Sequence, residues 1–387
     1  MLIGVPAETA TGENRVAATP ETVKKLVAQG HSVRVQAGAG GGASVTDEAF
    51  VAAGAELVDA ASAFGAELVL KVRNPSPGEI ALMKPGTVLV GMLEPFNAEG
   101  LERLAAAGLT AFALEAAPRT TRAQSMDVLS SQANIAGYKA VIMAADHYQK
   151  FFPMLMTAAG TVKAARVVIL GVGVAGLQAI ATAKRLGAVI EASDVRPSVK
   201  EQIESLGGKF IDVPYETDEE REAAEGVGGY ARPMPRSWLD RQQAEVAKRV
   251  ALADVVISTA LIPGRAAPTL ITEAMVQSMK PGSVIVDMAA GRGAPNPDGS
   301  VGGNCPLTVA DQTVTRHGVV IVGETNLASR VAADASQLYA RNVLDFLKLI
   351  LPPAAKGEPP ATLSIDLEDD IVAACRMAQD GAVTRQS

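Results

Sequence analysis

The feature that most constrains the fold is a glycine-rich turn between an apolar run and a helical stretch. The run RVVIL at 166–170 is typical of a buried strand, GVGVAG follows at 171–176, and LQAIATAKRLG continues with helical character. In such a unit Gly171 permits a tight turn, Gly173 lets the backbone approach a pyrophosphate, and Gly176 allows close packing of helix on strand. The helix presents its N-terminus to the phosphates. The segment therefore predicts a Rossmann turn that binds a dinucleotide.

An acidic residue at the end of the next strand refines the identity of that dinucleotide. AVIEASD ends in Asp194, which lies 194 − 176 = 18 residues after the last glycine of the turn. This is close to the spacing of the acid that accepts hydrogen bonds from the adenosine ribose. The carboxylate also repels a 2′-phosphate, whereas Arg196 could pair with one. We give Asp194 more weight because it stands at the strand end, and we predict an NAD(H) site.

The rest of the chain alternates short apolar runs with helical stretches, which indicates parallel sheets. One series runs from LIGVPAE to LTAFAL, and a second runs from RVVIL to GVVIVGE. A chain of 387 residues also exceeds the size at which a single core usually stops growing. We therefore predict an α/β protein with two Rossmann-like, doubly wound parallel-sheet domains joined by long helices.

Two proline-free stretches define how these domains are connected. The stretch from Ala123 to about Phe151 predicts a helix that bridges the domains, and the stretch at 326–350 predicts a helix that returns to the first domain. We expect a discontinuous first domain at 1–127 completed by 326–387. The NAD(H)-binding Rossmann domain is then expected at 128–325.

Composition and charge exclude several classes of function. The net charge of −7 and the lack of a Lys/Arg cluster argue against nucleic-acid binding. Cys305 and Cys375 stand far apart without metal-ligand spacing, so we predict neither a zinc site nor a disulfide. No signal peptide or apolar run of membrane-spanning length is present, and we expect a cytoplasmic chain with no direct membrane insertion.

The side chains that could accept a proton indicate which type of reaction the chain can catalyse. Oxidation of an alcohol or amine by NAD releases a proton that a general base must accept. The chain has three histidines, His31, His147 and His317, and their positions favour ordinary packing or surface roles. Hydride transfer between two nicotinamide rings releases no proton, so the scarcity of candidate bases is compatible with that reaction.

Three segments carry a resemblance to a known family. RTTRAQSMDVLSSQANIAGYKAV at 119–141, GVGVAGLQAIATAKRLGA at 171–188 and STALIPGRAAPTLIT at 258–272 closely resemble the NAD(H)-binding subunit, or domain I, of proton-translocating nicotinamide nucleotide transhydrogenase. The resemblance covers essentially the full chain. It implies a homodimer that binds NADH in the cleft between its domains and passes hydride to NADP on a partner subunit.

The same resemblance implies an organisation into subunits. The NADP site and the membrane-spanning part belong to partner subunits, which hold this chain at the inner membrane from the cytoplasmic side. Because no spanning segment follows Leu351, we expect the form in which this subunit is a separate polypeptide.

Carried over residue by residue, the resemblance assigns two groups of site residues. A polar group matches the residues that hold the nicotinamide carboxamide and ribose, and its members are Arg119, Gln124, Asp127 and Ser130. Three of these are three residues apart, so a helical backbone would keep neighbours adjacent. The residues matched to nucleotide binding are Gly171, Gly173, Val174, Gly176, Asp194, Val195, Arg196, Ala260 and Leu261. Tyr230 and Met234 match a mobile loop that closes over the bound nucleotide, with a solvated surface loop as the alternative.

Two rival functions remain open. Alanine dehydrogenase shares the two-domain fold, and Lys71 and Arg15 match its substrate-binding and catalytic positions. This chain has Glu94 where that enzyme places its catalytic histidine and Gly291 where it places an aspartate, which argues against the activity. A binding module that senses NAD without transferring hydride is the non-enzymatic alternative.

Overall fold

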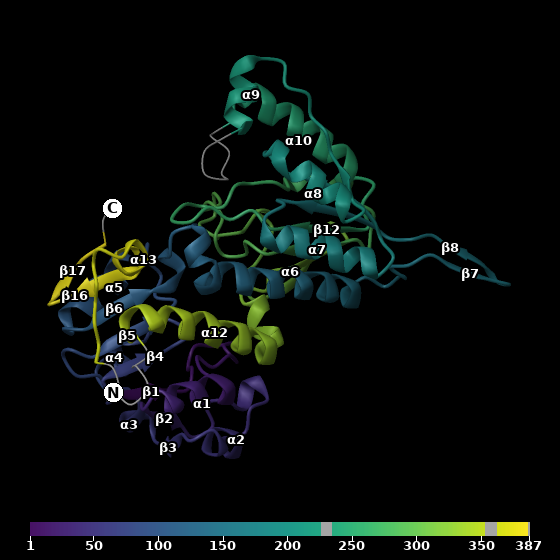
Figure 1. Ribbon diagram of the computed structural model, residues 1–387. Helices are drawn as coiled ribbons and strands as arrows, with labels where there is room; N and C mark the ends of the chain where they lie inside the picture. The colour runs from purple at the N-terminus through teal and green to yellow at the C-terminus, as the bar shows by residue number, and fades with distance from the viewer. Residues whose placement is uncertain (226–233, 353–361, 386–387) are drawn as a thin grey trace. The chain divides into compact units, whose positions relative to one another are not determined.

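The chain forms two compact α/β units, as the predicted fold class requires (Figure 1). The computed structural model describes residues 1–225, 234–352 and 362–385. The first unit comprises Met1–Gln132 and Ala328–Ser387, and the second comprises Ala133–Leu327. The first unit is therefore built from two segments that are separated in the sequence by the second unit.

The described part of the first unit contains an eight-stranded sheet. The strand order is β17-β16-β6-β5-β4-β1-β2-β3, with β1 to β6 parallel and β16 antiparallel to β6. The strands are β1 (Leu2–Val5), β2 (Ser32–Gln36), β3 (Glu56–Val58), β4 (Leu68–Leu70), β5 (Val88–Gly91), β6 (Thr110–Ala113), β16 (Arg376–Gln379) and β17 (Ala382–Val383). The last two strands show that the C-terminal segment extends the sheet of the N-terminal segment.

Helices cover both faces of this sheet. One face packs against α1 (Pro20–Ala28), α2 (Asp47–Ala52), α12 (Ala332–Ile350) and α13 (Asp370–Cys375). The other face packs against α3 (Ala60–Phe64), α4 (Pro77–Ile80) and α5 (Ala98–Ala106). Helix α12 is apolar along its buried side, and Tyr339 on that side donates a hydrogen bond of 2.7 Å from its hydroxyl to the Lys71 carbonyl. The return helix expected at 326–350 therefore packs on the first unit, although its first turn is the 3₁₀ helix η5 (Leu327–Val331).

The second unit repeats the doubly wound plan in a seven-stranded sheet of described residues. The strand order is β11-β10-β9-β12-β13-β15-β14, in which only β14 runs antiparallel to its neighbour among these paired strands. The strands are β9 (Arg166–Leu170), β10 (Val189–Ser193), β11 (Lys209–Phe210), β12 (Val255–Ser258), β13 (Val284–Asp287), β14 (Thr313–Arg316) and β15 (Val319–Val322). Strands β12 and β13 are buried along their whole length, as central parallel strands must be.

The helices of the second unit also lie on two faces. One face carries α6 (Val128–His147), α7 (Val174–Arg185) and α8 (Lys200–Ser205), and the other carries α10 (Arg236–Val250) and α11 (Glu273–Ser278). Alternate residues of one strand enter opposite cores, so that Val255 packs with the first group and Val256 with the second. Each fully buried Val or Ile contributes about 1.5–3 kcal/mol of burial free energy, which holds the sheet between its helices.

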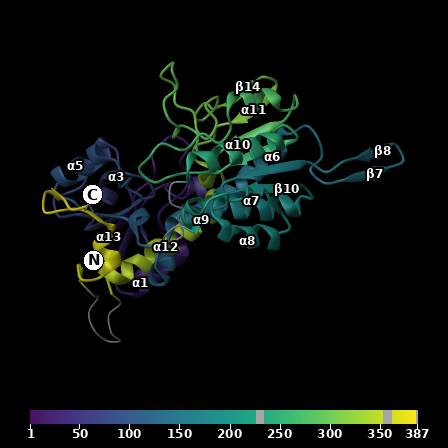
Figure 2. The same ribbon diagram turned by 90° about the horizontal axis from the view of Figure 1, so that it is seen from above.

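Two smaller elements complete the second unit. Helix α9 (Asp218–Glu225) precedes α10, and β7 (Leu155–Thr157) pairs with β8 (Gly160–Val162) in an antiparallel hairpin. Both views show this hairpin extending away from the sheet of its own unit (Figures 1 and 2).

Two features of the described residues concern membranes and metal ions. None of the helices in these residues has both the length and the apolar character needed to cross a bilayer. The same residues contain no group of three or more His, Cys, Asp or Glu side chains suited to hold a metal ion.

Candidate nucleotide-binding site

The candidate site lies where three parallel strands of the second unit end. Strand β9 pairs with β10 on one side and with β12 on the other, so the chain winds outward in both directions from β9. Ligands of doubly wound sheets bind at the carboxyl ends of the strands at this switch point. The residues that follow β9, β10 and β12 are the glycine turn, Asp194 and Thr259 with Ala260 and Leu261. The structure thus brings these predicted nucleotide-binding residues to one edge of the sheet.

Gly171 meets both requirements of a tight turn. Its φ of +90° lies in the region that favours glycine, and a Cβ atom there would stand 2.9 Å from the Thr259 hydroxyl oxygen. The Gly171 N–H donates to the Ser193 carbonyl at 2.9 Å, and the Thr259 hydroxyl donates to the Gly171 carbonyl at 2.8 Å. The first glycine is therefore tied to both neighbouring strands.

The second and third glycines have opposite surroundings. A Cβ on Gly176 would lie 2.1 Å from the Gly171 carbonyl oxygen, so only glycine allows α7 to approach the turn this closely. A Cβ on Gly173 would meet no described heavy atom within 4 Å. Gly173 is the N-cap of α7 and Val174 its first residue, so the amide groups of the first turn lack intrahelical partners and suit an anion.

Asp194 bonds to the turn and to Arg196. Its carboxylate accepts hydrogen bonds from the Val172 N–H at 2.7 Å and from the Arg196 N–H, Nε and Nη2 at 2.9, 2.9 and 3.0 Å. Arg196 Nη2 also donates to the Val172 carbonyl at 3.2 Å. The two side chains therefore fasten the end of β10 to the glycine turn. The sequence indicated Asp194 as a ribose ligand and Arg196 as its rival, and it did not indicate that the two residues pair with each other.

The residues after Asp194 lead to a small apolar cluster. Val195 and Tyr215 pack against buried Met234 and Trp238, and the Tyr215 and Trp238 rings stack with centroids 5.9 Å apart. Met234 therefore anchors the start of α10 in this structure, whereas its expected role over the nucleotide stays a prediction. Tyr230, the other residue of the predicted loop, lies outside the described residues.

The loop after β12 is held by a residue that sequence reasoning missed. Ala260 exchanges two hydrogen bonds with the side chain of Asn304, and Leu261 beside it is exposed. Asn304 stands in the glycine-rich segment VGGNCP, where an amide side chain hints at a backbone contact. Its partner lies 44 residues earlier, and no local pattern reveals that distance.

The polar group predicted in the first unit is arranged around the start of α6. Asp127 accepts hydrogen bonds from the Ser130 N–H at 2.9 Å and from the Ser130 hydroxyl at 2.5 Å. Gln124 belongs to the 3₁₀ helix η3 (Thr121–Met126) and is exposed, as is Arg119 before it. The structure thus joins Asp127 to Ser130, and the role of all four toward the nicotinamide stays a prediction.

The single helix expected from Ala123 to about Phe151 is wrong at its start. The backbone leaves the helical region at Asp127, where ψ is 89°, between η3 and α6. The Asp127 carboxylate satisfies an amide at the beginning of α6, and this capping separates the two helices. Asn342 of α12 holds η3 in place by donating to the Ser125 carbonyl at 2.7 Å.

The two residues shared with the dehydrogenase pattern are buried and paired. The Lys71 amine lies 2.9 Å from Glu79 and 3.2 Å from Glu8, and burial raises the pKa of Glu8. Arg15 contacts Glu13 through Nε at 2.7 Å and Nη2 at 2.6 Å. These carboxylates balance the two cations inside the first unit.

Comparison with known proteins gives the family. Models of the alanine dehydrogenase/PNT N-terminal and C-terminal domains match residues 4–136 and 140–386. An NAD(P) transhydrogenase alpha subunit chain of Rhodospirillum rubrum is 51% identical over 391 residues, covering 99% of this chain and 97% of the relative. A transhydrogenase structure from Sinorhizobium meliloti has 46% identity and a TM-score of 0.86, covering 99% of this chain and all of that chain (100%). Alanine dehydrogenase of Bacillus subtilis is 34% identical, covering 86% of this chain and 80% of the relative. The chain therefore belongs to the alanine dehydrogenase/PNT family and, within it, to the NAD(P) transhydrogenase alpha subunits.

Proposed function

We propose that this chain binds NAD(H) at the carboxyl end of β9 and exchanges a hydride directly with NADP(H) held on a partner subunit. The observation that carries the proposal is the glycine turn at 171–176. Gly171 is required by its positive φ and by the nearby Thr259 hydroxyl, and Gly176 by the nearby Gly171 carbonyl, whereas a Cβ on Gly173 would meet no described heavy atom within 4 Å at a helix N-terminus. A pyrophosphate needs this combination of fixed turn and accessible backbone.

The surroundings and positions of the three histidines support direct hydride transfer between nucleotides. Burial lowers the pKa of His31, and His317 is bonded to Glu273 at 2.9 Å. His147 ends α6, at the opposite end of that helix from Asp127 and Ser130. Hydride transfer from one nicotinamide to another needs no proton acceptor, so these roles are compatible with the reaction.

The partner is inferred from the relatives. The chain aligns over almost its full length with proteins named as alpha subunits, and a subunit name implies other subunits. We infer that a partner binds NADP(H) and that membrane-spanning subunits hold the assembly at the inner membrane from the cytoplasmic side. The alpha chain then acts as the NAD(H) half of a two-nucleotide enzyme.

We also propose that the chain forms a homodimer through the hairpin β7–β8. All six residues of the two hairpin strands are exposed, with Met156 at 70%, and Met154 just before them is 60% exposed. A two-stranded hairpin alone in water is marginally stable, so an apolar one calls for a covering surface. A second copy supplies it by a symmetric exchange of hairpins, in which each copy gives and receives the same surface.

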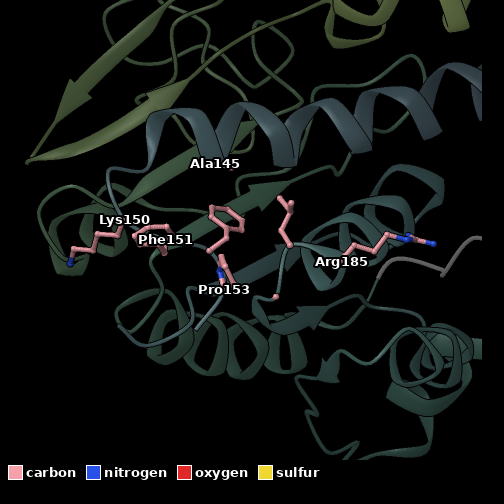
Figure 3. Close-up of a pocket in the computed structure, with 8 residues that line it drawn as sticks. Ala145, Lys150, Phe151, Pro153 and Arg185 are labelled. Carbon is pink, nitrogen blue, oxygen red and sulfur yellow. The ribbon is translucent and has the colours of Figure 1, made fainter. Parts of the chain in front are cut away.

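A hollow at the base of the hairpin suits such an exchange. It measures about 490 Å³ and is lined by Phe151, Phe152 and Pro153 together with Lys150 and Arg185. Figure 3 shows the two cationic side chains at opposite ends of the row, with the aromatic and proline rings between them. Apolar side chains of a second hairpin would find an apolar floor with polar ends.

The decisive experiment is a transhydrogenation assay with the purified chain, NADH and an oxidised NADP analogue. We expect no turnover by the chain alone and hydride transfer to the analogue once a separately produced NADP-binding subunit is added. A Gly173→Ala chain serves as the matched control, since it should fold normally and lose nucleotide binding.

Two outcomes would overturn the proposal. NADH oxidation by the isolated chain with pyruvate and ammonia would identify an alanine-type dehydrogenase. NADH binding without transfer in the presence of a folded NADP-binding subunit would identify a sensing module.

A further inference from the structure

A buried amide side chain clamps the loop that follows β12. Asn304 is fully buried, and its Oδ1 accepts from the Ala260 N–H at 3.1 Å. Its Nδ2 donates to the Ala260 carbonyl at 2.9 Å and to the Pro268 carbonyl at 2.8 Å. One side chain therefore bonds both backbone groups of Ala260, as a neighbouring strand would.

The backbone around Asn304 is in turn held by Asp287, the last residue of β13. This fully buried carboxylate accepts hydrogen bonds from the Asn304 N–H at 3.2 Å, the Cys305 N–H at 2.9 Å and the Thr308 hydroxyl at 2.7 Å. A Cβ on Gly303 would stand 2.3 Å from the same carboxylate, so only glycine fits before Asn304. The backbone at Asn304 thus has one well-defined position.

The clamped loop contacts the glycine turn directly. Thr259, the residue before Ala260, donates its hydroxyl to the Gly171 carbonyl at 2.8 Å. An unbroken series of contacts therefore runs from Asp287 through Asn304 and Ala260 to Gly171. This series links the end of β13 to the turn after β9.

We propose that Asn304 is a positioning residue for the bound dinucleotide, acting through Ala260 and Thr259. The inference rests on the proposed NAD(H) site and adds a residue to it. A loop held in one conformation before binding costs less entropy to order when the nucleotide arrives. Loss of the clamp should weaken nucleotide binding, and it should leave the transfer step nearly unchanged once the site is saturated.

Asn304→Asp is the first test, because it preserves the size and the acceptor for the Ala260 N–H. The variant loses both donor bonds and sets a carboxylate against the Ala260 and Pro268 carbonyls. We expect the Kd for NADH, measured by calorimetry, to rise about tenfold, as the loss of paired buried hydrogen bonds implies. With the NADP-binding subunit present, the KM for NADH should rise similarly and kcat should stay within about twofold.

Ser283→Ala is the matched control, since it removes another buried hydrogen bond of the second unit, donated by the Ser283 hydroxyl to the Ala253 carbonyl, at the opposite end of β13 from Asp287. It should lower the melting temperature and leave the Kd for NADH unchanged. An affinity loss in both variants that follows their loss of stability would reduce Asn304 to a purely structural residue and overturn the inference.

Thr259→Val covers the case in which Asn304→Asp does not fold. It keeps the shape of the side chain and removes only the bond to Gly171, so we expect weaker NADH binding in a folded protein. Unchanged affinity would contradict the inference. If the unmodified chain failed to bind NADH, the proposed function would fail instead, and the two failures are therefore distinguishable.

Discussion

At the scale of single residues, the pairing of Asp194 with Arg196 at the end of β10 limits which further hydrogen bonds the Asp194 carboxylate can accept. An ionised carboxylate has about four acceptor sites, and four N–H groups of the chain already point at this one. Only 7% of the Asp194 side chain is exposed. A ribose hydroxyl must therefore share this carboxylate with Arg196 or displace it, and the two residues should act as one unit.

A double-mutant cycle tests this coupling. We expect Asp194→Asn and Arg196→Met each to weaken NADH binding about tenfold, and the double variant to lose no more than either alone, because each change breaks the same pair. Calorimetric Kd values for the four proteins give the answer. Lys200→Met, which removes an exposed cation from the next helix, should bind NADH normally. Additive losses in the double variant would instead assign the two residues independent contacts.

A buried carboxyl of the first unit predicts a pH effect. Burial raises the pKa of Glu115 from 4.5 to about 7, and its Oε2 has no hydrogen-bond partner among the described residues. The folded state therefore holds a proton that the unfolded state releases at lower pH. The free energy of unfolding should fall as pH rises from 4.5 to about 7 and level off above.

Glu115→Gln should remove this dependence. At pH 8 the variant should be more stable than the unmodified chain by up to about 3 kcal/mol, and at pH 4 the two should be nearly equal. Urea unfolding at both pH values measures the difference. Glu99→Gln changes an exposed carboxylate and should shift neither value. Equal stability of the Glu115 variant and the unmodified chain at pH 8 would show that the carboxyl is ionised without penalty.

At the scale of elements, the unit of β9, glycine turn and α7 separates folding from binding. A Cβ at Gly176 would overlap protein atoms, whereas a Cβ at Gly173 would meet no described heavy atom within 4 Å. Alanine should therefore disturb folding at the first position and nucleotide binding at the second. We expect Gly176→Ala to lower the melting temperature by several degrees, since its Cβ would overlap the Gly171 carbonyl. Gly173→Ala should keep the melting temperature and raise the Kd for NADH at least about tenfold by blocking the pyrophosphate. Normal NADH binding by a folded Gly173→Ala chain would place the nucleotide elsewhere.

The same element shows what a sequence can predict and where prediction ends. The strand, the three glycines and the acid are neighbours in sequence, and each has a local conformational requirement that leaves a readable pattern. The break at Asp127 depends on a rotamer that caps α6, and proline-free composition says nothing of it. The pairing of Asp194 with Arg196 and the clamp of Asn304 on Ala260 depend on tertiary geometry. Residue types in those positions suggest polar contacts, but only the fold selects the partners.

At the scale of the whole molecule, the two sheets share one order of parallel strands and differ in the strands that are added at one edge. The first sheet gains β16 and β17 from the C-terminal segment, and the second gains the antiparallel edge strand β14. Each addition covers an edge of a parallel sheet, which would otherwise present unpaired backbone groups. The hairpin β7–β8 belongs to neither sheet, so the protection of a sheet edge does not explain its exposed apolar residues.

The proposed dimer gives that explanation and makes the last prediction. In Met154→Lys/Met156→Lys, two charged side chains would have to enter an apolar surface of the second copy, at a cost of several kcal/mol that a reversible interface does not tolerate. We expect the unmodified chain to sediment as a dimer at micromolar concentration and this variant to sediment as a folded monomer.

Val383→Lys provides the control, because Val383 is an apolar residue of the first unit with 42% exposure, and this variant should remain dimeric. A hairpin variant that stays dimeric would move the interface to another surface, and a monomeric unmodified chain would remove the homodimer altogether. The hairpin is thus the element on which the proposed quaternary structure depends, just as the glycine turn is the one on which nucleotide binding depends.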